Sequence, residues 1–166
     1  MKRQKRKYSR PLRPWNKPRL DAERSFSIEY GLKKKKELWR VEAILSDWRS
    51  RARELQGAHN KVEEQHLLEK LMKLGLLKEG ATLDDVLALE TIDLLNRRLQ
   101  TLVFKKGLAN TPVQARQFIV HGHIALDGKK ARWPSTIVSA DQNEKIGYYG
   151  KGKVKGVVAA AKEGKK

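Results

Sequence analysis

The sequence predicts an α+β fold in which an N-terminal helical domain precedes a small domain of two helices and short antiparallel strands. Apolar residues recur at three- and four-residue spacing through most of residues 34–106, which is the period of amphipathic helices. Short runs around an Asp-Gly pair at 127–128 follow, and they indicate a β-hairpin. Basic segments poor in apolar residues occupy both ends and predict disordered tails, because they bury too little apolar surface to order alone.

These patterns divide the 166 residues into four segments. We expect a basic N-terminal arm at 1–19, a helical domain at 20–92, a small α+β domain at 93–149 and a basic flexible tail at 150–166. The arm contains three prolines and no acidic residue, so we expect it to order only on a partner.

The helical domain is predicted to contain three helices followed by a shorter one. Helical patterns cover residues 21–30, 34–56 and 60–74, and each ends just before a glycine, the residue most common after helix C-termini. Thr82 and the two aspartates that follow it indicate the start of the short helix. The four tryptophans are expected to anchor the core or the arm: Trp15, Trp39, Trp48 and Trp133.

A helix over residues 91–106 is predicted to separate a core face from a cationic face, since each residue advances by about 100°. The core face carries Leu95, Leu99, Leu102 and Val103. The opposite arc carries Arg97, Arg98, Thr101 and Lys105. Phe104 falls beside this arc, where it either packs on the next helix or stacks on a base.

The second helix of the small domain is predicted from Pro112 to His121. Thr111 caps it and Gln114 completes a capping box. Arg116 falls between apolar positions of this helix, which predicts either an ion pair, with Asp127 or Asp93 as candidates, or an RNA contact. Short strands are expected at 124–126, 129–132, 136–139 and 145–149, with Lys129 and Lys130 at the tip of the hairpin.

The formal net charge of +18 is distributed unevenly along the chain. The two tails together hold +14, and residues 93–133 hold eight basic and two acidic residues, a net of +6. Residues 20–92 are nearly balanced at −1. This arrangement favours a polyanion such as RNA as the partner, because neutralised phosphates release counterions.

Other classes of function lack their motifs in this sequence. There is no cysteine, no Walker loop and no G-x-S-x-G elbow, so we expect no enzyme activity, no cofactor and no small-molecule substrate. His121 and His123 offer two ligands where a metal site needs three or four, so we expect no metal. No apolar run approaches the roughly 18 residues of a membrane span, so we expect no membrane partner and a cytoplasmic location.

Motifs in the second half of the chain follow the order of a known domain. They are "RR" at 97–98, "GLA" at 107–109, "AR" at 115–116, "HGHI" at 121–124, "DG" at 127–128 and "PS" at 134–135. In this order they resemble the S-four RNA-binding domain. Upstream, "KYSRPLRPW", "EYGLKKKKELWRVEAIL" and "RSRARELQG" are similar to the archaeal and eukaryotic branch of the small-subunit ribosomal protein S-four family. Some bacterial members carry a zinc-binding cysteine cluster that this chain lacks.

The resemblance implies a structural component of the small ribosomal subunit. Such a protein would bind small-subunit ribosomal RNA in its 5′ domain, contact neighbouring small-subunit proteins, nucleate assembly of the subunit body and lie near the messenger entry channel. The alternative is a non-ribosomal RNA-binding module of the same domain type, such as a stress factor or a transfer-RNA-binding appendage. An RNA-modifying enzyme is disfavoured, because no second domain of catalytic size remains outside the matched region.

The residues predicted to contact RNA lie on the two helices of the small domain, at its hairpin and in the N-terminal arm. They are Arg97, Arg98, Thr101, Lys105, Lys106, Thr111, Gln114, Arg116, Gln117, His121, His123, Lys129, Lys130, Arg132, Lys2, Arg3, Lys5, Arg6 and Lys7. The basic side chains would engage phosphates, and the amides and imidazoles would reach ribose hydroxyls and base edges. Taken singly, each is also compatible with an ordinary solvated surface.

Overall fold

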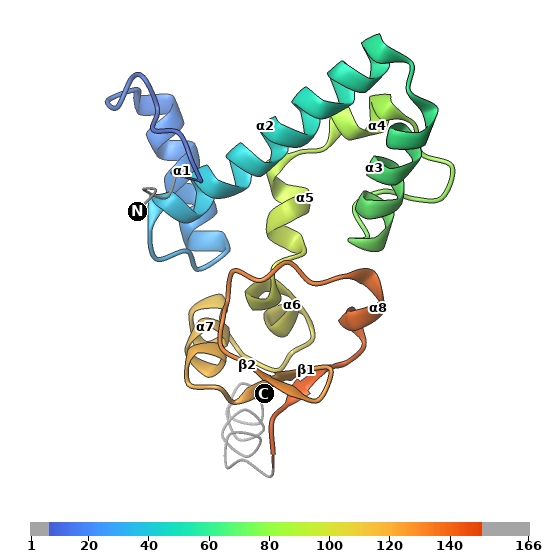
Figure 1. Cartoon of the computed structure of the whole chain (residues 1–166). Helices are drawn as coiled ribbons and strands as arrows, with labels where there is room; N and C mark the ends of the chain where they lie inside the picture. The colour runs from blue at the N-terminus through green and yellow to red at the C-terminus, as the bar shows by residue number, and fades with distance from the viewer. Residues whose placement is uncertain (1–6, 151–166) are drawn as a thin grey trace, which may run out of the picture.

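The computed structural model describes residues 7–150. Figure 1 shows a helical part above and a small α+β part below. The elements are α1 (Lys17–Glu29), α2 (Lys35–Ala58), α3 (Lys61–Lys73), α4 (Leu83–Ala88), α5 (Thr91–Asn96), α6 (Leu99–Lys105), α7 (Pro112–Val120), β1 (Ile124–Leu126), β2 (Lys129–Ala131), α8 (Ala140–Asn143) and β3 (Ile146–Tyr148). Within the described residues, no helix is long and apolar enough to cross a membrane.

The long helix α2 is the spine of the helical part. Helix α1 packs at its beginning, α3 and α4 pack toward its end, and α5 leads from it to the small domain (Figure 1). Its buried positions recur with the helical period and confirm the predicted core face: Leu38, Val41, Leu45, Ala52 and Leu55. Together with Leu94 and Leu95 of α5 they form one apolar core.

The small domain has a separate apolar core. Helices α6 and α7 pack against each other and share this core with an antiparallel sheet of strand order β2-β1-β3. The predicted hairpin is confirmed, with Leu126 paired to Lys129. Asp127 and Gly128 have φ of 53° and 74°, the left-handed conformation that a two-residue hairpin turn requires.

The helix predicted over residues 91–106 is wrong as a single element, because it is two helices with a break at Arg97 and Arg98. Arg98 has an extended backbone and forms an isolated antiparallel bridge with Ile137. Val138 N donates to Arg97 O at 3.0 Å, and Leu99 N donates to Thr136 O at 2.8 Å. The strand expected at 136–139 thus pairs with the helix break instead of the sheet, and these tertiary hydrogen bonds override a continuous helical pattern.

The arm prediction needs correction at its end, since α1 begins at Lys17. Pro18 lies in the first turn of α1, a position that proline favours. Trp39 anchors this region as expected, because its Nε1 donates to Glu23 Oε1 at 3.1 Å and its ring lies 6.0 Å from that of Tyr8. The remaining arm predictions, for Lys2, Arg3, Lys5 and Arg6, and the tail at 151–166 lie outside the described residues.

Candidate nucleic-acid interface

A cleft of about 660 Å³ lies between the first turns of α2 and the small domain. Its small-domain wall comes from α7 and from the segment that leads from β2 to the helix break. Among the described residues that line it, six are cationic and one is a carboxylate: Lys34, Lys36, Arg40, Arg98, Arg116, Arg132 and Glu37. The single carboxylate is already bound to two of the arginines.

Glu37, Arg98 and Arg116 form a charged cluster that we call the interdomain triad. Arg116 donates from Nη2 to Glu37 Oε1 at 2.9 Å and from Nη1 to Oε2 at 3.0 Å, and Arg98 Nη2 donates to Oε2 at 2.7 Å. The side chains of Arg98 and Glu37 are 3% and 14% exposed. Burial alone would raise the pKa of Glu37, but the hydrogen bonds from Arg116 and Arg98 outweigh it and hold that pKa below its ordinary value.

The triad shows the partner of Arg116 within the protein, and an RNA contact by the same side chain stays a prediction. The ion-pair prediction is confirmed, but the partner is Glu37 and neither of the carboxylates proposed from sequence. Asp127 instead lies 3.4 Å from Lys145 Nζ, and Asp93 Oδ2 accepts from Glu90 N at the start of α5. The charge of Arg116 is therefore used to join the two domains.

Arg98 and Thr101 do not lie on the exposed cationic face that the sequence predicted. Arg98 is buried in the triad, and Thr101 is 6% exposed with its Oγ1 donating to Leu95 O at 2.7 Å. The helix break causes this, because α6 starts anew at Leu99 and does not continue the wheel of α5. Leu99 N donates to Thr136 O, so Leu95 O lacks that helical donor and accepts from Thr101 instead. Arg97 is partly buried, and its Nε and Nη2 have no hydrogen-bond partner among the described residues; burial lowers its pKa.

Gln100 holds the same region together, a role that its sequence position did not predict. Its buried Nε2 lies 3.0 Å from three carbonyl oxygens, those of Tyr30, Gly31 and Pro112. The end of α1, the start of α6 and the start of α7 therefore meet at one amide. Gly31 has φ of 61°, and a Cβ built there would lie 2.9 Å from Gln100 Nε2, so this junction needs glycine.

Four cationic side chains that line the cleft are exposed and form no ion pair among the described residues. We call Lys34, Lys36, Arg40 and Arg132 the rim cations: all four are exposed, and none has an ion pair within residues 7–150. Three of them were not predicted as RNA contacts, because residues 20–92 are balanced as a whole. The local signal was present in the run of four lysines at 33–36.

Comparisons with known proteins match both the small domain and most of the chain. The S4 domain family model matches residues 97–143. The small ribosomal subunit protein uS4 of Methanothermobacter thermautotrophicus is 45% identical over 162 residues, which cover 96% of this chain and 95% of the relative. The protein of the same name from Saccharolobus islandicus is 47% identical over 152 residues, with 89% and 84% covered. The chain belongs to the uS4 family. The match confirms the predicted S-four domain, and its first residue is Arg97, at the helix break.

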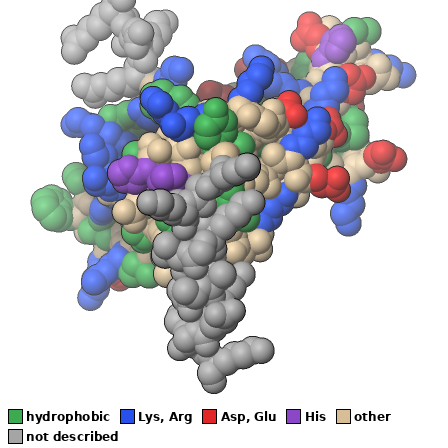
Figure 2. Space-filling model, turned by 90° about the horizontal axis from the view of Figure 1, so that it is seen from below, with side chains coloured by type: hydrophobic (Ala, Val, Ile, Leu, Met, Phe, Trp, Pro, Cys, Tyr) green, Lys and Arg blue, Asp and Glu red, His purple; other side chains and the backbone are tan. Residues whose placement is uncertain are grey.

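In this uS4-family chain, a second group of predicted RNA-contacting residues lies outside the cleft. Those on the surface of α7 and the hairpin are exposed: Gln117, His121, Lys129 and Lys130. Lys130 Nζ lies 5.7 Å from the centre of the Tyr149 ring, and the rings of His121 and His123 are 6.3 Å apart. Figure 2 shows Lys and Arg side chains gathered beside His on the left of this face, whereas the Asp and Glu side chains in view lie mostly on the right, among other Lys and Arg.

The other predicted contacts at the ends of α6 and α7 have structural partners. Lys105 Nζ donates to Asn96 Oδ1 at 2.9 Å, and Lys106 Nζ donates to Asn143 O. Thr111 caps α7 as predicted by accepting from Gln114 N at 3.1 Å. Gln114 Oε1 accepts from Asn110 N at 2.7 Å, one residue before the donor that a standard capping box uses. Lysines 105 and 106 are still exposed, so a phosphate can reach them.

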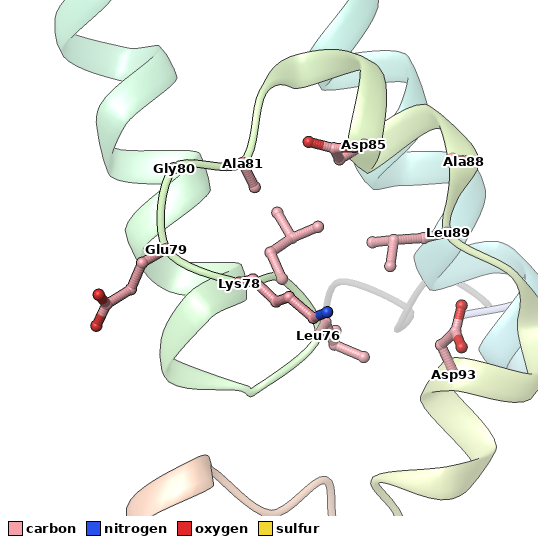
Figure 3. Close-up of a pocket in the computed structure, with 10 residues that line it drawn as sticks. Leu76, Lys78, Glu79, Gly80, Ala81, Asp85, Ala88, Leu89 and Asp93 are labelled. Carbon is pink, nitrogen blue, oxygen red and sulfur yellow. The ribbon is translucent and has the colours of Figure 1, made fainter.

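A further pocket, of about 390 Å³, lies between the 76–81 loop and the helices α4 and α5 (Figure 3). Two carboxylates from these helices line it, Asp85 from α4 and Asp93 from α5. Each already accepts a backbone hydrogen bond at 2.8 Å, from Thr82 N and Glu90 N, and so caps its helix. Within residues 7–150, no three His, Asp or Glu side chains are grouped to hold a metal ion. The two helix-capping carboxylates are therefore explained by local structure.

Proposed function

We propose that this uS4-family protein is a structural component of the small ribosomal subunit and binds small-subunit ribosomal RNA without catalysing a reaction. One observation carries the proposal: the rim cations come from both domains, line one cleft and form no ion pair within the described residues. Cations in this state lose little on meeting phosphates and gain the release of counterions. The family assignment supports the same partner.

The interdomain triad gives this surface a fixed geometry. Because Glu37 is bound at once to Arg98 at the helix break and to Arg116 of α7, the lysines at the start of α2 are held at a set distance from Arg132. A preformed surface loses less conformational entropy on binding, so it can select a folded RNA whose phosphates match that spacing. Phosphate contacts of this kind position a protein on RNA and do not read sequence.

The finer roles expected from the resemblance are part of the same proposal. The RNA partner is the 5′ domain of small-subunit ribosomal RNA, and binding there nucleates assembly of the subunit body in the cytoplasm. The protein then contacts neighbouring small-subunit proteins and lies near the messenger entry channel. Beyond the cleft, the exposed residues of α7 and the hairpin extend the RNA surface, and the N-terminal arm adds contacts of its own.

The test is a binding titration of the full chain against two RNAs of equal length, a 5′-domain fragment and an unrelated structured RNA, at several salt concentrations. We expect the ribosomal fragment to keep a large advantage as salt rises. A general polycation would lose affinity for both RNAs in parallel, and that outcome would contradict the proposal. Failure to co-sediment with small subunits would instead favour the non-ribosomal alternative.

A further inference from the structure

Trp133 presents an unpartnered aromatic face at the cleft. It lines the cleft next to Arg132, and it is 75% exposed. Within residues 7–150, neither another ring nor a cation stacks on it. A tryptophan side chain offers a large apolar area that proteins usually bury, so leaving it in solvent here forgoes stabilisation of the fold.

The backbone that carries Trp133 is fixed. Thr136 N donates to Trp133 O at 3.2 Å, and Gln100 N donates to Pro134 O at 3.4 Å. Because Thr136 O also accepts from Leu99 N, the turn is attached to the first residues of α6 at two points. The indole is therefore held at the cleft by the small domain and does not sit on a free loop.

The chemistry around this ring selects its partner. Rim cations and an exposed aromatic face line the same cleft, and the only carboxylate among the described lining residues is neutralised by two arginines. An apolar protein side chain would match the ring but leave the cations unpaired. An unpaired nucleotide matches both, because its base stacks on an aromatic ring while its flanking phosphates meet the cations.

We propose that Trp133 is the stacking platform for one unpaired nucleotide of the bound RNA, whose neighbouring phosphates lie on the rim cations. This inference rests on the proposed RNA-binding function and adds a reason why the cleft would bind one kind of RNA better than another. A regular duplex keeps its bases stacked inside, whereas a bulge, loop or junction can release one. The cleft then distinguishes folded RNA with an unstacked base from a plain duplex of equal charge.

The test compares the wild-type full chain with Trp133→Phe and Trp133→Leu in titrations of the 5′-domain fragment. Loss of one stacked base costs about 5- to 150-fold in affinity, so Trp133→Leu should weaken binding within that range and Trp133→Phe should retain most of it. Val62→Ala, an exposed apolar position in α3, is the control and should bind like wild type. All four proteins should unfold at the same temperature, since neither side chain supports a core.

A second readout locates the nucleotide. Base-specific chemical probing should show an unpaired base that the wild type and Trp133→Phe protect and that Trp133→Leu leaves reactive. The slope of log affinity against log salt should be unchanged in both variants, because every phosphate keeps its cation.

Equal affinity of Trp133→Leu and wild type would overturn the inference while leaving the proposed function intact. If that variant bound naked RNA normally but failed to enter subunits, the ring would be a protein-docking site and the inference would again be wrong. If the wild type itself did not prefer the ribosomal fragment, the proposed function would fail first.

Discussion

Glu37 and Arg116 form a two-point hydrogen-bonded fork, at 2.9 and 3.0 Å, across 79 residues of sequence. Forked Arg–carboxylate pairs fix direction as well as distance. One member belongs to the spine of the helical part and the other to the second helix of the S4 domain. Arg98 adds a third member from the break before α6, so one carboxylate joins side chains on both sides of the boundary between the two cores.

Glu37→Gln should destabilise the protein, because it leaves Arg98 and Arg116 without a counter-charge in a poorly solvated place. Breaking a buried ion pair by removing one partner typically costs on the order of 3 kcal/mol. The free energy of unfolding in urea measures the effect. Glu54→Gln, on the exposed side of the same helix, is the matched control and should change it by less than about 0.5 kcal/mol. Equal losses in the two variants would show that the triad has no special role.

The triad should also make stability depend on pH. The folded-state pKa of Glu37 is lowered, so the unfolded chain takes up its proton first as the pH falls. The stabilisation is then complete above the ordinary glutamate pKa of about 4.3 and is lost as the pH drops through the lower folded-state value. Urea midpoints between about pH 3 and pH 7 should fall more steeply for the wild type than for Glu37→Gln. Parallel pH profiles would contradict this.

Reversal of two rim cations, Lys34→Glu with Lys36→Glu, should weaken binding to the 5′-domain fragment. It should also reduce the slope of log affinity against log salt by about 1 for each phosphate that is no longer neutralised. The matched control is Lys70→Glu with Lys73→Glu, two exposed lysines at the end of α3. Similar decreases in RNA affinity for the two double variants would mean that the total charge of the protein, and not the cleft, drives binding. Reversal at Arg98 is unsuitable for this test, since it would disrupt the triad.

Gly31→Ala should destabilise the junction around Gln100. The left-handed backbone costs an L-residue about 1–2 kcal/mol, and the added Cβ would lie 3.0 Å from Pro112, so a further loss from the displaced amide follows. Gly57→Ala is the opposite case, because this glycine lies inside α2 and its Cβ would meet nothing within 4 Å. Replacement there should stabilise by about 0.5–1 kcal/mol. The thermal unfolding temperature should therefore fall below that of the wild type for Gly31→Ala and rise above it for Gly57→Ala.

The elements that local patterns govern were predicted well. Helices α2 and α7 and the Asp127 turn follow from periodicity, capping and the hairpin dipeptide, which act within a few residues. The break at Arg97 was not predictable in this way, because its cause is pairing with residues 136–138. The partner of Arg116 was missed for the same reason.

The candidate site was only partly predictable. The hairpin lysines and the amide and imidazole side chains of α7 could be proposed from sequence, because charge and side-chain type stand out locally, and their exposed positions leave that proposal open. Lys34 and Lys36 were not, because acidic residues elsewhere in the helical domain cancel them in a segment sum. Arg98 was misassigned, since a helical wheel assumes that the helix continues. Which cations remain free is decided by long-range pairing, and sequence periodicity carries no information about that.

The backbone bridge between Arg98 and Ile137 also bears on the order in which the parts of the chain fold during synthesis. The helical core ends at Leu95, so most of its contacts are available once that residue has emerged from the exit tunnel. Ile137 packs on this core as well, and the bridge needs residues 136–138. The nascent chain therefore completes its first core well before it can set the angle between its two parts, and the cleft between them forms late in translation.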